Sequence, residues 1–505
     1  MSADEQRRWT LSTSGGSEQT GTGYLSTAET HIGALVFAGD RVYKLKKPVD
    51  LGFVDFRDRK TRLWACRREL ELNRRLAPDV YLDVLDVGPP GHEPCDHLVL
   101  MRRMPADRSL AALVEAGTPV EDEVREVAKK LAGFHSCAER GDEIAAEGAP
   151  DAVAGRWNTN VDGLRSFGGD LLDEQLLDEI AEHGRVFLEG RAPLLNRRVA
   201  EGRIVDGHGD VLSEDVFCLD DGPRILDCIE FDDRLRRLDA VDDAVCLAMD
   251  LEYRGAPELA ERFLDWYAQF SDDAVPPGLR HFYTAYRALV RTKVACAKHS
   301  PGDEEAASDA REHLALAADH IRRAVPRLVL VGGLPGSGKT TLSERIADRL
   351  GAVLLSSDRV RKEIADLSPA EPAPAEYRSG LYSAEHTERT YDELVRRSGE
   401  LLGYGESVVL DASWTREHHR ERAVEAANQA RAIVVPLRCQ APESTTVERL
   451  RGRHATASDA DEEVARSIAS DADDWPSAWP IDTTGSPEDS ADEAVAVIAD
   501  PQRST

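Results

Sequence analysis

The chain has 505 residues, of which 41% are hydrophobic and 31% charged, and its formal net charge is −30. This length predicts two or three domains, and the composition is typical of a globular protein. The negative charge argues against a protein that coats nucleic acid, because such a protein needs many lysines and arginines to neutralise phosphates.

Signals for a membrane or for export are not evident. No apolar run approaches the roughly 18 residues of a membrane span. No apolar segment follows the charged residues 1–8, so we expect no signal peptide and a cytoplasmic location. Residues 11–29 are rich in Ser, Thr and Gly, and we expect residues 1–24 to be mobile. The eight cysteines form no C-x-x-C pair, and no metal-ligand pattern of Cys and His stands out, so buried free thiols are expected.

A β-hairpin is predicted near the start, from apolar runs at 29–38 and 41–47 around a Gly-Asp turn. Lys44 lies on its second strand, and a helix predicted at about 58–76 carries Glu69. A strand lysine and a glutamate on the next helix hold nucleotide phosphates in protein-kinase-like folds. A surface lysine with an exposed helix glutamate would give the same pattern. Residues 97–104 have the look of a strand and hinge between two lobes.

The next informative segment is a tight loop and hairpin over residues 207–231, with acids at Asp210, Asp215 and Asp227. Kinase-like chemistry needs one Asp to orient or deprotonate an acceptor hydroxyl, and Asp210 has the position for it. It also needs Mg²⁺ ligands, for which Asp215 and Asp227 are the candidates. Two alternatives remain open, namely an acidic surface loop and a degenerate, inactive kinase-like domain.

Helical patterns cover most of residues 121–137 and 172–191, and helices are predicted to continue to about 300. A further helix near 304–324 leads into Pro326, and a domain boundary is expected there.

A glycine-rich motif, G-x-x-x-x-G-K-T, occupies residues 333–340, between an apolar strand and a helix with i, i+4 apolar spacing. In this context the glycines let backbone N–H groups converge on phosphates, Lys339 reaches the β/γ-phosphates and the Thr340 hydroxyl ligates Mg²⁺. The predicted ATP-binding residues of this loop are Gly333, Pro335, Gly336, Ser337, Gly338, Lys339, Thr340 and Thr341.

Three further strands are predicted at 352–357, 407–410 and 432–437, and a possible fifth at 479–483. They alternate with helical segments, which predicts a parallel sheet with helices on both faces. The second strand, 352–357, is expected beside the P-loop strand, so that Asp358 at its carboxyl end lies where substrates bind. Asp358 could take a proton from an acceptor hydroxyl, and Arg361 could contact an anionic substrate. Asp411 ends the third strand in the position of an acidic Mg²⁺ ligand. Arg449 and Arg453 share one helical face and could neutralise phosphates. Asp358 could instead be the N-cap of a helix. The two arginines could instead lie on a solvated helix face.

The N-terminal loop, H-G-D at 208–210 with Asp215 and Asp227, resembles the aminoglycoside phosphotransferase family, a branch of the kinase-like fold. The resemblance covers roughly residues 25–300 and implies that Lys44 and Glu69 are the nucleotide-phosphate lysine and its helix partner. Position 215 is Asp where the family usually has Asn, and Leu212 stands where many members have His. Only Gly21-Thr22-Gly23 offers a weak candidate for a glycine loop over the phosphates.

The C-terminal motifs resemble P-loop kinases of the polynucleotide-kinase-like and gluconate-kinase-like group, often classed with AAA-type ATP-binding domains. No arginine-finger or sensor pattern of a ring-forming motor is evident. The whole layout is similar to bacterial proteins that fuse an aminoglycoside phosphotransferase-like domain to a P-loop kinase domain. The expected fold is an α+β kinase-like bilobal domain (25–325) followed by an α/β P-loop domain with a parallel sheet (326–505).

The resemblance implies a phosphotransferase with two Mg·ATP sites, ATP and Mg²⁺ as cofactors and a small-molecule hydroxyl acceptor, with no membrane partner. One alternative is a regulatory ATP-binding protein or ATPase with a pseudokinase N-terminal domain. Another is a polynucleotide 5′-hydroxyl kinase, which the acidic net charge disfavours.

Overall fold

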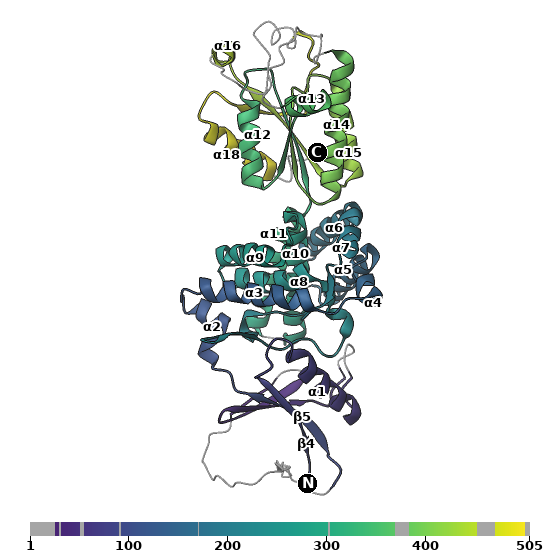
Figure 1. Cartoon of the computed structure of the whole chain (residues 1–505), viewed down its shortest axis with the longest axis vertical. Helices are drawn as coiled ribbons and strands as arrows, with labels where there is room; N and C mark the ends of the chain where they lie inside the picture. The colour runs from purple at the N-terminus through teal and green to yellow at the C-terminus, as the bar shows by residue number, and fades with distance from the viewer. Residues whose placement is uncertain are drawn as a thin grey trace. The chain divides into compact units, whose positions relative to one another are not determined.

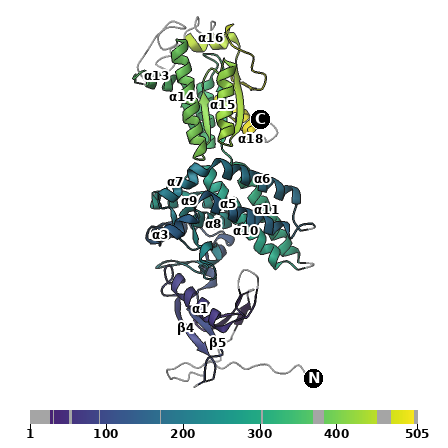
Figure 2. The same cartoon turned by 90° about the vertical axis from the view of Figure 1, so that its right-hand side faces the viewer.

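The computed structural model describes residues 26–29, 32–50, 55–89, 92–169, 171–300, 303–368, 383–451 and 470–499 (Figures 1 and 2). The chain divides into two compact units, each built from two stretches of sequence. The first unit contains residues 1–149 and 198–274, and the second contains residues 150–197 and 275–505. The predicted mobile segment 1–24, the weak glycine-loop candidate Gly21-Thr22-Gly23 and Arg453 lie outside the described residues.

The first unit begins with a five-stranded antiparallel sheet in the order β1-β2-β3-β5-β4. The predicted hairpin is confirmed, because β2 and β3 pair across a turn at Gly39, which has a φ of +61°. Helix α1 packs against β4 and β5 over an apolar core that includes Val42, Cys66 and Val99. The elements are β1 (Ser26–Glu29), β2 (Gly33–Ala38), β3 (Arg41–Lys46), α1 (Arg59–Asn73), β4 (Tyr81–Val87) and β5 (Asp96–Arg102).

The rest of the first unit is mainly helical and carries two short hairpin-like sheets. Helix α9 packs against both α3 and α8, and α8 is buried along most of its length because its residues are largely apolar. These elements are η1 (Ala106–Arg108), α2 (Leu110–Glu115), α3 (Glu121–Cys137), α4 (Asp142–Ala146), β6 (Ile204–Asp206), η2 (Ser213–Asp215), β7 (Val216–Leu219), β8 (Gly222–Ile225), η3 (Asp233–Leu235), β9 (Arg237–Asp239), α8 (Ala240–Tyr253) and α9 (Pro257–Ser271).

The second unit combines a group of helices with the parallel sheet. Helices α10 and α11 form a closely packed pair, and α6 packs on α11. Arg191, fully buried at the start of α7, donates hydrogen bonds to the carbonyl oxygens of Leu402 and Ala430, at the ends of α14 and α15. The helices of this group are α5 (Pro150–Arg165), α6 (Glu174–Gly190), α7 (Ala192–Ala200), α10 (Pro277–Lys298) and α11 (Glu304–Ala324).

The parallel sheet has five strands in the order β11-β12-β10-β13-β14, which confirms the predicted fifth strand. Helices α13, α14 and α15 cover one face, and α12 and α18 cover the other (Figure 1). The elements are β10 (Arg327–Gly332), α12 (Lys339–Leu350), β11 (Val353–Ser356), α13 (Ser357–Ile364), α14 (Ala384–Gly403), β12 (Val408–Asp411), α15 (Glu417–Gln429), β13 (Ile433–Gln440), α16 (Glu443–Arg451), β14 (Trp479–Asp482) and α18 (Pro487–Ala499).

The predicted fold class is confirmed, with an α+β arrangement in the N-terminal part and a parallel α/β sheet at the C-terminal end. β11, the strand that precedes Asp358, does not occupy its predicted position beside the P-loop strand. β11 does not lie beside β10, because β12 runs between them. The boundary at residue 326 stays a prediction.

All eight cysteines are free, as expected, but Cys95 and Cys137 are exposed rather than buried. Within the described residues, no helix is both long enough and apolar enough to cross a membrane.

Candidate functional site

The loop between β10 and α12 wraps tightly around the beginning of the helix. Gly336 has a φ of +85° and Gly338 a φ of +89°, both in the region that favours glycine. A Cβ at Gly336 would also lie only 2.8 Å from the carbonyl oxygen of Thr446. The loop therefore requires glycine, and it ends at the N-terminus of α12, where free backbone N–H groups favour an anion. Pro335 and Ser337 are buried in the loop, and Lys339, Thr340 and Thr341 form the first turn of the helix.

Thr340 and Asp411 meet at the carboxyl end of the sheet. The Thr340 hydroxyl donates to Oδ2 of Asp411 over 2.9 Å. Asp411 is buried, and burial raises its pKa, an effect that the Lys339 charge opposes. Its other oxygen, Oδ1, is buried and has no hydrogen-bond partner among the described residues. An oxygen-only donor pair with an unsatisfied carboxylate oxygen suits Mg²⁺, so these residues fit the predicted cation.

Arg449, on α16, lies against the glycine loop. Its Nη2 donates to the carbonyl oxygen of Thr483 over 2.6 Å, and a Cβ at Gly338 would lie 3.3 Å from its Nη1. That Nη1 atom is buried, and no residue in the described part of the chain accepts a hydrogen bond from it. The alternative of a solvated helix face is therefore wrong for Arg449, which points a spare donor toward the helix start.

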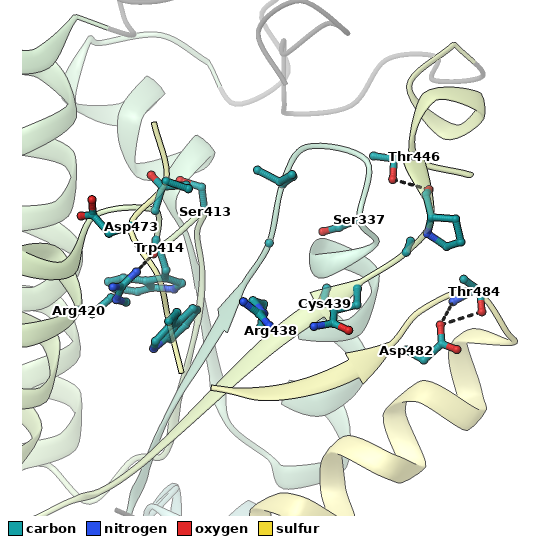
Figure 3. A pocket seen from close by; sticks show the side chains of 18 residues that line it. Ser337, Ser413, Trp414, Arg420, Arg438, Cys439, Thr446, Asp473, Asp482 and Thr484 are labelled. Atoms are coloured by element: carbon teal, nitrogen blue, oxygen red, sulfur yellow. Dashed lines mark hydrogen bonds between the residues drawn. The ribbon is translucent and has the colours of Figure 1, made fainter. Parts of the chain in front are cut away.

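Two hollows flank the glycine loop. One has a volume of about 450 Å³ and is lined by residues of α12, the segment after β14 and Arg449. The other, about 820 Å³, opens on the side of the sheet covered by α15. Figure 3 shows this larger cavity with Trp414, Arg420 and Asp473 at one side, Ser337 and Arg438 in the middle, and Thr446, Asp482 and Thr484 at the other side.

Asp358 and Arg361 follow β11 on helix α13. The helix has Ser356 as its N-cap residue, so Asp358 is the second helical residue, and the N-cap alternative is wrong. Asp358 is half-buried, and its negative charge adds to the rise in the pKa of Asp411. Arg361 is buried, and its carbonyl oxygen accepts from Nε2 of His386. The register aligns Ser356 with Asp411, so both acids lie at the same end of the sheet.

A second cluster of charges lies in the first unit, around Lys44 on β3. The Lys44 ammonium group is 2.8 Å from Oε1 of Glu69 and 2.5 Å from Oδ1 of Asp227. Glu69 is fully buried, so the alternative of an exposed surface pair is wrong. Burial alone would raise the pKa of Glu69, but the charges of Lys44 and Lys46 outweigh it and lower the pKa.

Asp210, Asp215 and Asp227 lie close enough to interact. Burial raises the pKa of Asp215, and the negative charges of Asp227, Glu214 and Asp210 raise it further. The loop that carries Asp210 is braced by Asp243, whose carboxylate accepts from the backbone N–H groups of His208 and Gly209. Converging carboxylates that repel one another form a donor set that a divalent cation relieves. The residues therefore fit the predicted Mg²⁺, and their roles stay predictions.

Sequence reasoning placed Lys46 on the same strand face as Lys44 but did not assign it to this cluster. Lys46 is completely buried, with its ammonium group 2.6 Å from Oε2 of Glu69 and in contact with Glu230. The signal was present, because Lys44 and Lys46 share one face of a strand. In the second unit, Trp414, Arg420 and Arg438 of the larger cavity were also missed, since they come from separate elements with no motif spacing.

Comparisons with known proteins found relatives of the whole chain and of its C-terminal part. A family model described as "AAA domain" matches residues 328–473. The uncharacterized protein Rv2004c of Mycobacterium tuberculosis is 41% identical over 471 residues, which cover 93% of this chain and 95% of that protein.

Among solved structures, a choline/ethanolamine kinase family protein from Mesorhizobium loti is 18% identical, with a TM-score of 0.35, over 59% of this chain and 93% of that one. A sugar kinase from Janibacter sp. HTCC2649 is 20% identical, with a TM-score of 0.28, over 36% of this chain and 99% of that one. The identity and coverage shared with the mycobacterial protein establish the kinship: this chain belongs to the same family as Rv2004c of Mycobacterium tuberculosis.

Proposed function

We propose that this protein is an ATP-dependent phosphotransferase that moves the γ-phosphoryl group of ATP to a hydroxyl of a small molecule at the P-loop of the second unit. The observation that carries the proposal is the Thr340–Asp411 pair, with its buried, unsatisfied Oδ1 atom, at the end of a glycine loop. Phosphoryl transfer depends mainly on positioning and charge neutralisation, and this site supplies both.

Each residue of the P-loop site has a distinct part in the proposed reaction. Lys339 and the N-terminus of α12 hold the phosphates, and Thr340 with Asp411 would hold Mg²⁺, which offsets charge on the transferring group. Nη1 of Arg449, which has no acceptor among the described residues, would donate to the same phosphates. Asp358 orients or deprotonates the acceptor hydroxyl, and Arg361 contacts an anionic part of the acceptor.

The two hollows suggest how donor and acceptor share the loop. The smaller one, beside α12 and Arg449, would take the nucleoside of ATP. The acceptor would lie on the opposite side, where Trp414 and Arg438 of the larger cavity would contact part of it. Asp358 and Arg361 do not line that cavity, so the reacting hydroxyl and an anionic group of the acceptor would extend beyond it toward α13. This arrangement suits in-line transfer, because the attacking and leaving oxygens then approach the phosphoryl group from opposite directions.

The proposal includes a second Mg·ATP site in the first unit, as in an aminoglycoside phosphotransferase-like domain. Lys44, held by Glu69, would contact the phosphates, and Asp215 and Asp227 would hold Mg²⁺. Asp210 would receive or orient the proton of the acceptor hydroxyl.

A regulatory first unit is the second candidate, and one observation favours it. Lys44 is ion-paired directly with Asp227 at 2.5 Å, so the cation and one of the proposed Mg²⁺ ligands already satisfy each other. ATP and Mg²⁺ must separate this pair before a kinase site forms. A pseudokinase would keep the pair and bind Mg·ATP poorly.

The test is ATP-dependent phosphorylation by the full chain, read as phosphorylated products by mass, with metabolites, aminoglycosides and 5′-hydroxyl oligonucleotides as acceptors. We expect Lys339→Ala to lower transfer at the P-loop by about 10²–10³-fold, since it removes a preorganised charge. Asp210→Asn should abolish only products made in the first unit, and Lys129→Ala, on the exposed face of α3, serves as the control.

The outcomes separate the candidates. If neither Lys339→Ala nor Asp210→Asn lowers any transfer, the kinase proposal fails. If only Lys339→Ala acts, and that variant no longer binds Mg·ATP, the first unit is regulatory. Phosphate that appears only on oligonucleotides would make the protein a polynucleotide kinase instead.

A further inference from the structure

Two histidines and a glutamate converge where α14 and α15 pack against each other. Helices α14 and α15 lie side by side on one face of the sheet (Figures 1 and 2). Glu388 comes from α14, and His418 and His419 come from the first turn of α15. The Nε2 atoms of His418 and His419 lie 3.0 Å and 2.9 Å from the same atom, Oε1 of Glu388. One donor atom from each of the three residues lies within 4.8 Å of the other two.

Neighbouring side chains hold this cluster in position. The His419 ring stacks on Tyr391, with ring centroids 3.9 Å apart and planes inclined by 7°. Arg422 donates to Oε2 of Glu388 over 2.7 Å and also contacts Asp392, which leaves Oε1 turned toward the two imidazoles. Partners that fix the orientation of ligating side chains are a regular feature of metal sites.

The donor set has a chemical preference. Two imidazole nitrogens with one carboxylate oxygen suit Zn²⁺ and similar transition-metal ions, whereas Mg²⁺ prefers oxygen donors alone. His419 is buried, and its Nε2 atom lies 2.9 Å from Oε1 of Glu388. His418 and Glu388 are 53% and 45% exposed, which gives an ion a route of entry and room for a water ligand.

We propose that Glu388, His418 and His419 form a three-ligand site for a divalent transition-metal ion of the zinc class, with its remaining coordination position open to water. The site is separate from the cation position at Thr340 and Asp411, and it does not depend on the phosphotransferase proposal. To bind the ion, both imidazoles present the Nε2 lone pair, so the ring proton of each resides on Nδ1.

The position of this site connects it to the wall of the larger cavity. Tyr391 stacks on His419, and its hydroxyl shares a hydrogen bond with the Ser413 hydroxyl at 3.1 Å. The same Tyr391 oxygen accepts from the backbone N–H of Trp414 at 3.2 Å. Trp414 has a φ of +52°, which is rare for a bulky residue, and these contacts hold it there. A metal ion that fixes the His419 ring therefore steadies Tyr391 and the cavity wall behind it.

The test is cobalt(II) binding by the full-length protein. The protein is stripped of metal with a chelator and titrated with Co²⁺ in the presence of excess Mg²⁺, which occupies sites built from oxygen donors. The visible ligand-field absorption of Co²⁺ reports nitrogen-containing, four-coordinate binding, and displacement by Zn²⁺ gives the relative affinity. We expect one equivalent of bound Co²⁺, displaced by one equivalent of Zn²⁺.

Four variants decide where the ion binds. His418→Ala, on an exposed side chain, and Glu388→Gln should each weaken Co²⁺ binding by at least about tenfold. His183→Ala, which removes an imidazole from α6, and Asp411→Asn, which alters the P-loop cation position, should leave it unchanged. The proposal is overturned if wild-type protein binds no equivalent of Co²⁺. It is also overturned if either His418→Ala or Glu388→Gln binds like wild type.

Discussion

Glu69 is the residue on which the charge balance of the first unit depends. One of its oxygens faces Lys44 and the other faces Lys46, at 2.8 Å and 2.6 Å, and no part of the side chain is exposed. Glu69 is the only carboxylate in contact with both ammonium groups, whereas Asp227 contacts Lys44 alone and Glu230 contacts Lys46 alone among the described ion pairs. The same residue that would position Lys44 for a phosphate is therefore required for the stability of the lobe.

We expect Glu69→Gln to lower the free energy of unfolding by about 1–3 kcal/mol. The change removes the carboxylate that Lys44 and Lys46 share and leaves each lysine with one acid, Asp227 or Glu230. The measurement is urea denaturation of the full chain, followed by circular dichroism. Glu71→Gln, two residues along the same helix and exposed, is the matched control and should change stability by less than about 0.5 kcal/mol. Equal effects of the two changes would contradict this account of Glu69.

At the scale of elements, the pair α10 and α11 contains a contact between two histidines, His320, which is buried, and His281, which is half-buried. The Nδ1 atoms of His281 and His320 lie 3.0 Å apart, so one ring donates and the other accepts. Burial lowers the pKa of His281 to about 2, and the positive charges of Arg323, Arg280 and Arg327 act in the same direction. His281 is thus neutral in the folded protein over the whole physiological range.

This depressed pKa makes stability depend on pH. An exposed His281 in the unfolded chain has a pKa near 6.5. Below that pH the unfolded state binds a proton on His281, whereas the folded state does not. The contribution of His281 is fully present above pH 6.5 and falls by about 1.4 kcal/mol per pH unit below it. His281→Asn, which keeps a polar atom near the Nδ1 position, should remove this slope. Denaturation curves between pH 7.5 and about 5 measure it, and parallel pH profiles for the two proteins would refute the prediction.

Local patterns predicted the elements well, while long-range geometry was only partly accessible. The P-loop, its strand and its helix are contiguous, so one window of sequence contains their whole geometry. The cluster around Glu69 joins residues more than 150 positions apart, and only the family resemblance suggested that Lys44 and Asp227 meet. The place of β11 at the sheet edge depends on how strands pair, which the spacing of apolar residues does not encode.

The same limit explains the histidine and glutamate cluster. His418 and His419 are adjacent in sequence, whereas the usual metal motifs place ligands one or more helical turns apart. Glu388 lies 30 residues earlier and reaches them only because α14 and α15 pack together. A search for Cys and His patterns in the sequence therefore had no signal to find.

At the scale of the whole chain, stretches of the second unit that are far apart in sequence are joined by buried hydrogen bonds. Arg191 belongs to the helical group, yet its buried guanidinium group satisfies the carbonyl oxygens of Leu402 and Ala430. Arg191 has no exposed surface, and this burial lowers its pKa to about 10. The ends of α14 and α15 thus obtain their hydrogen-bond donors from a residue more than 200 positions earlier.

Arg191→Ala should lower the free energy of unfolding of the full chain by about 1–2 kcal/mol. It removes the donor of the Ala430 carbonyl oxygen and one of two donors of the Leu402 carbonyl oxygen, which also accepts from the Gly405 N–H. Arg185→Ala, on the exposed side of α6, removes only surface ion pairs and should cost less than about 1 kcal/mol. Thermal and urea denaturation of both variants provide the comparison. An unchanged Arg191→Ala protein would mean that water replaces the guanidinium group at these helix ends.

The alternation of the two units along the chain has a consequence for synthesis on the ribosome. The polypeptide passes from one unit to the other three times, at residues 149/150, 197/198 and 274/275. The segment 150–197 emerges early but packs with residues that are translated only after position 275. The apolar side chains that α5 and α6 bury against α10 and α11 therefore stay exposed, or shielded by a chaperone, until residues 277–324 have been made. Truncated products that end before α10 should be unusually prone to aggregation and degradation.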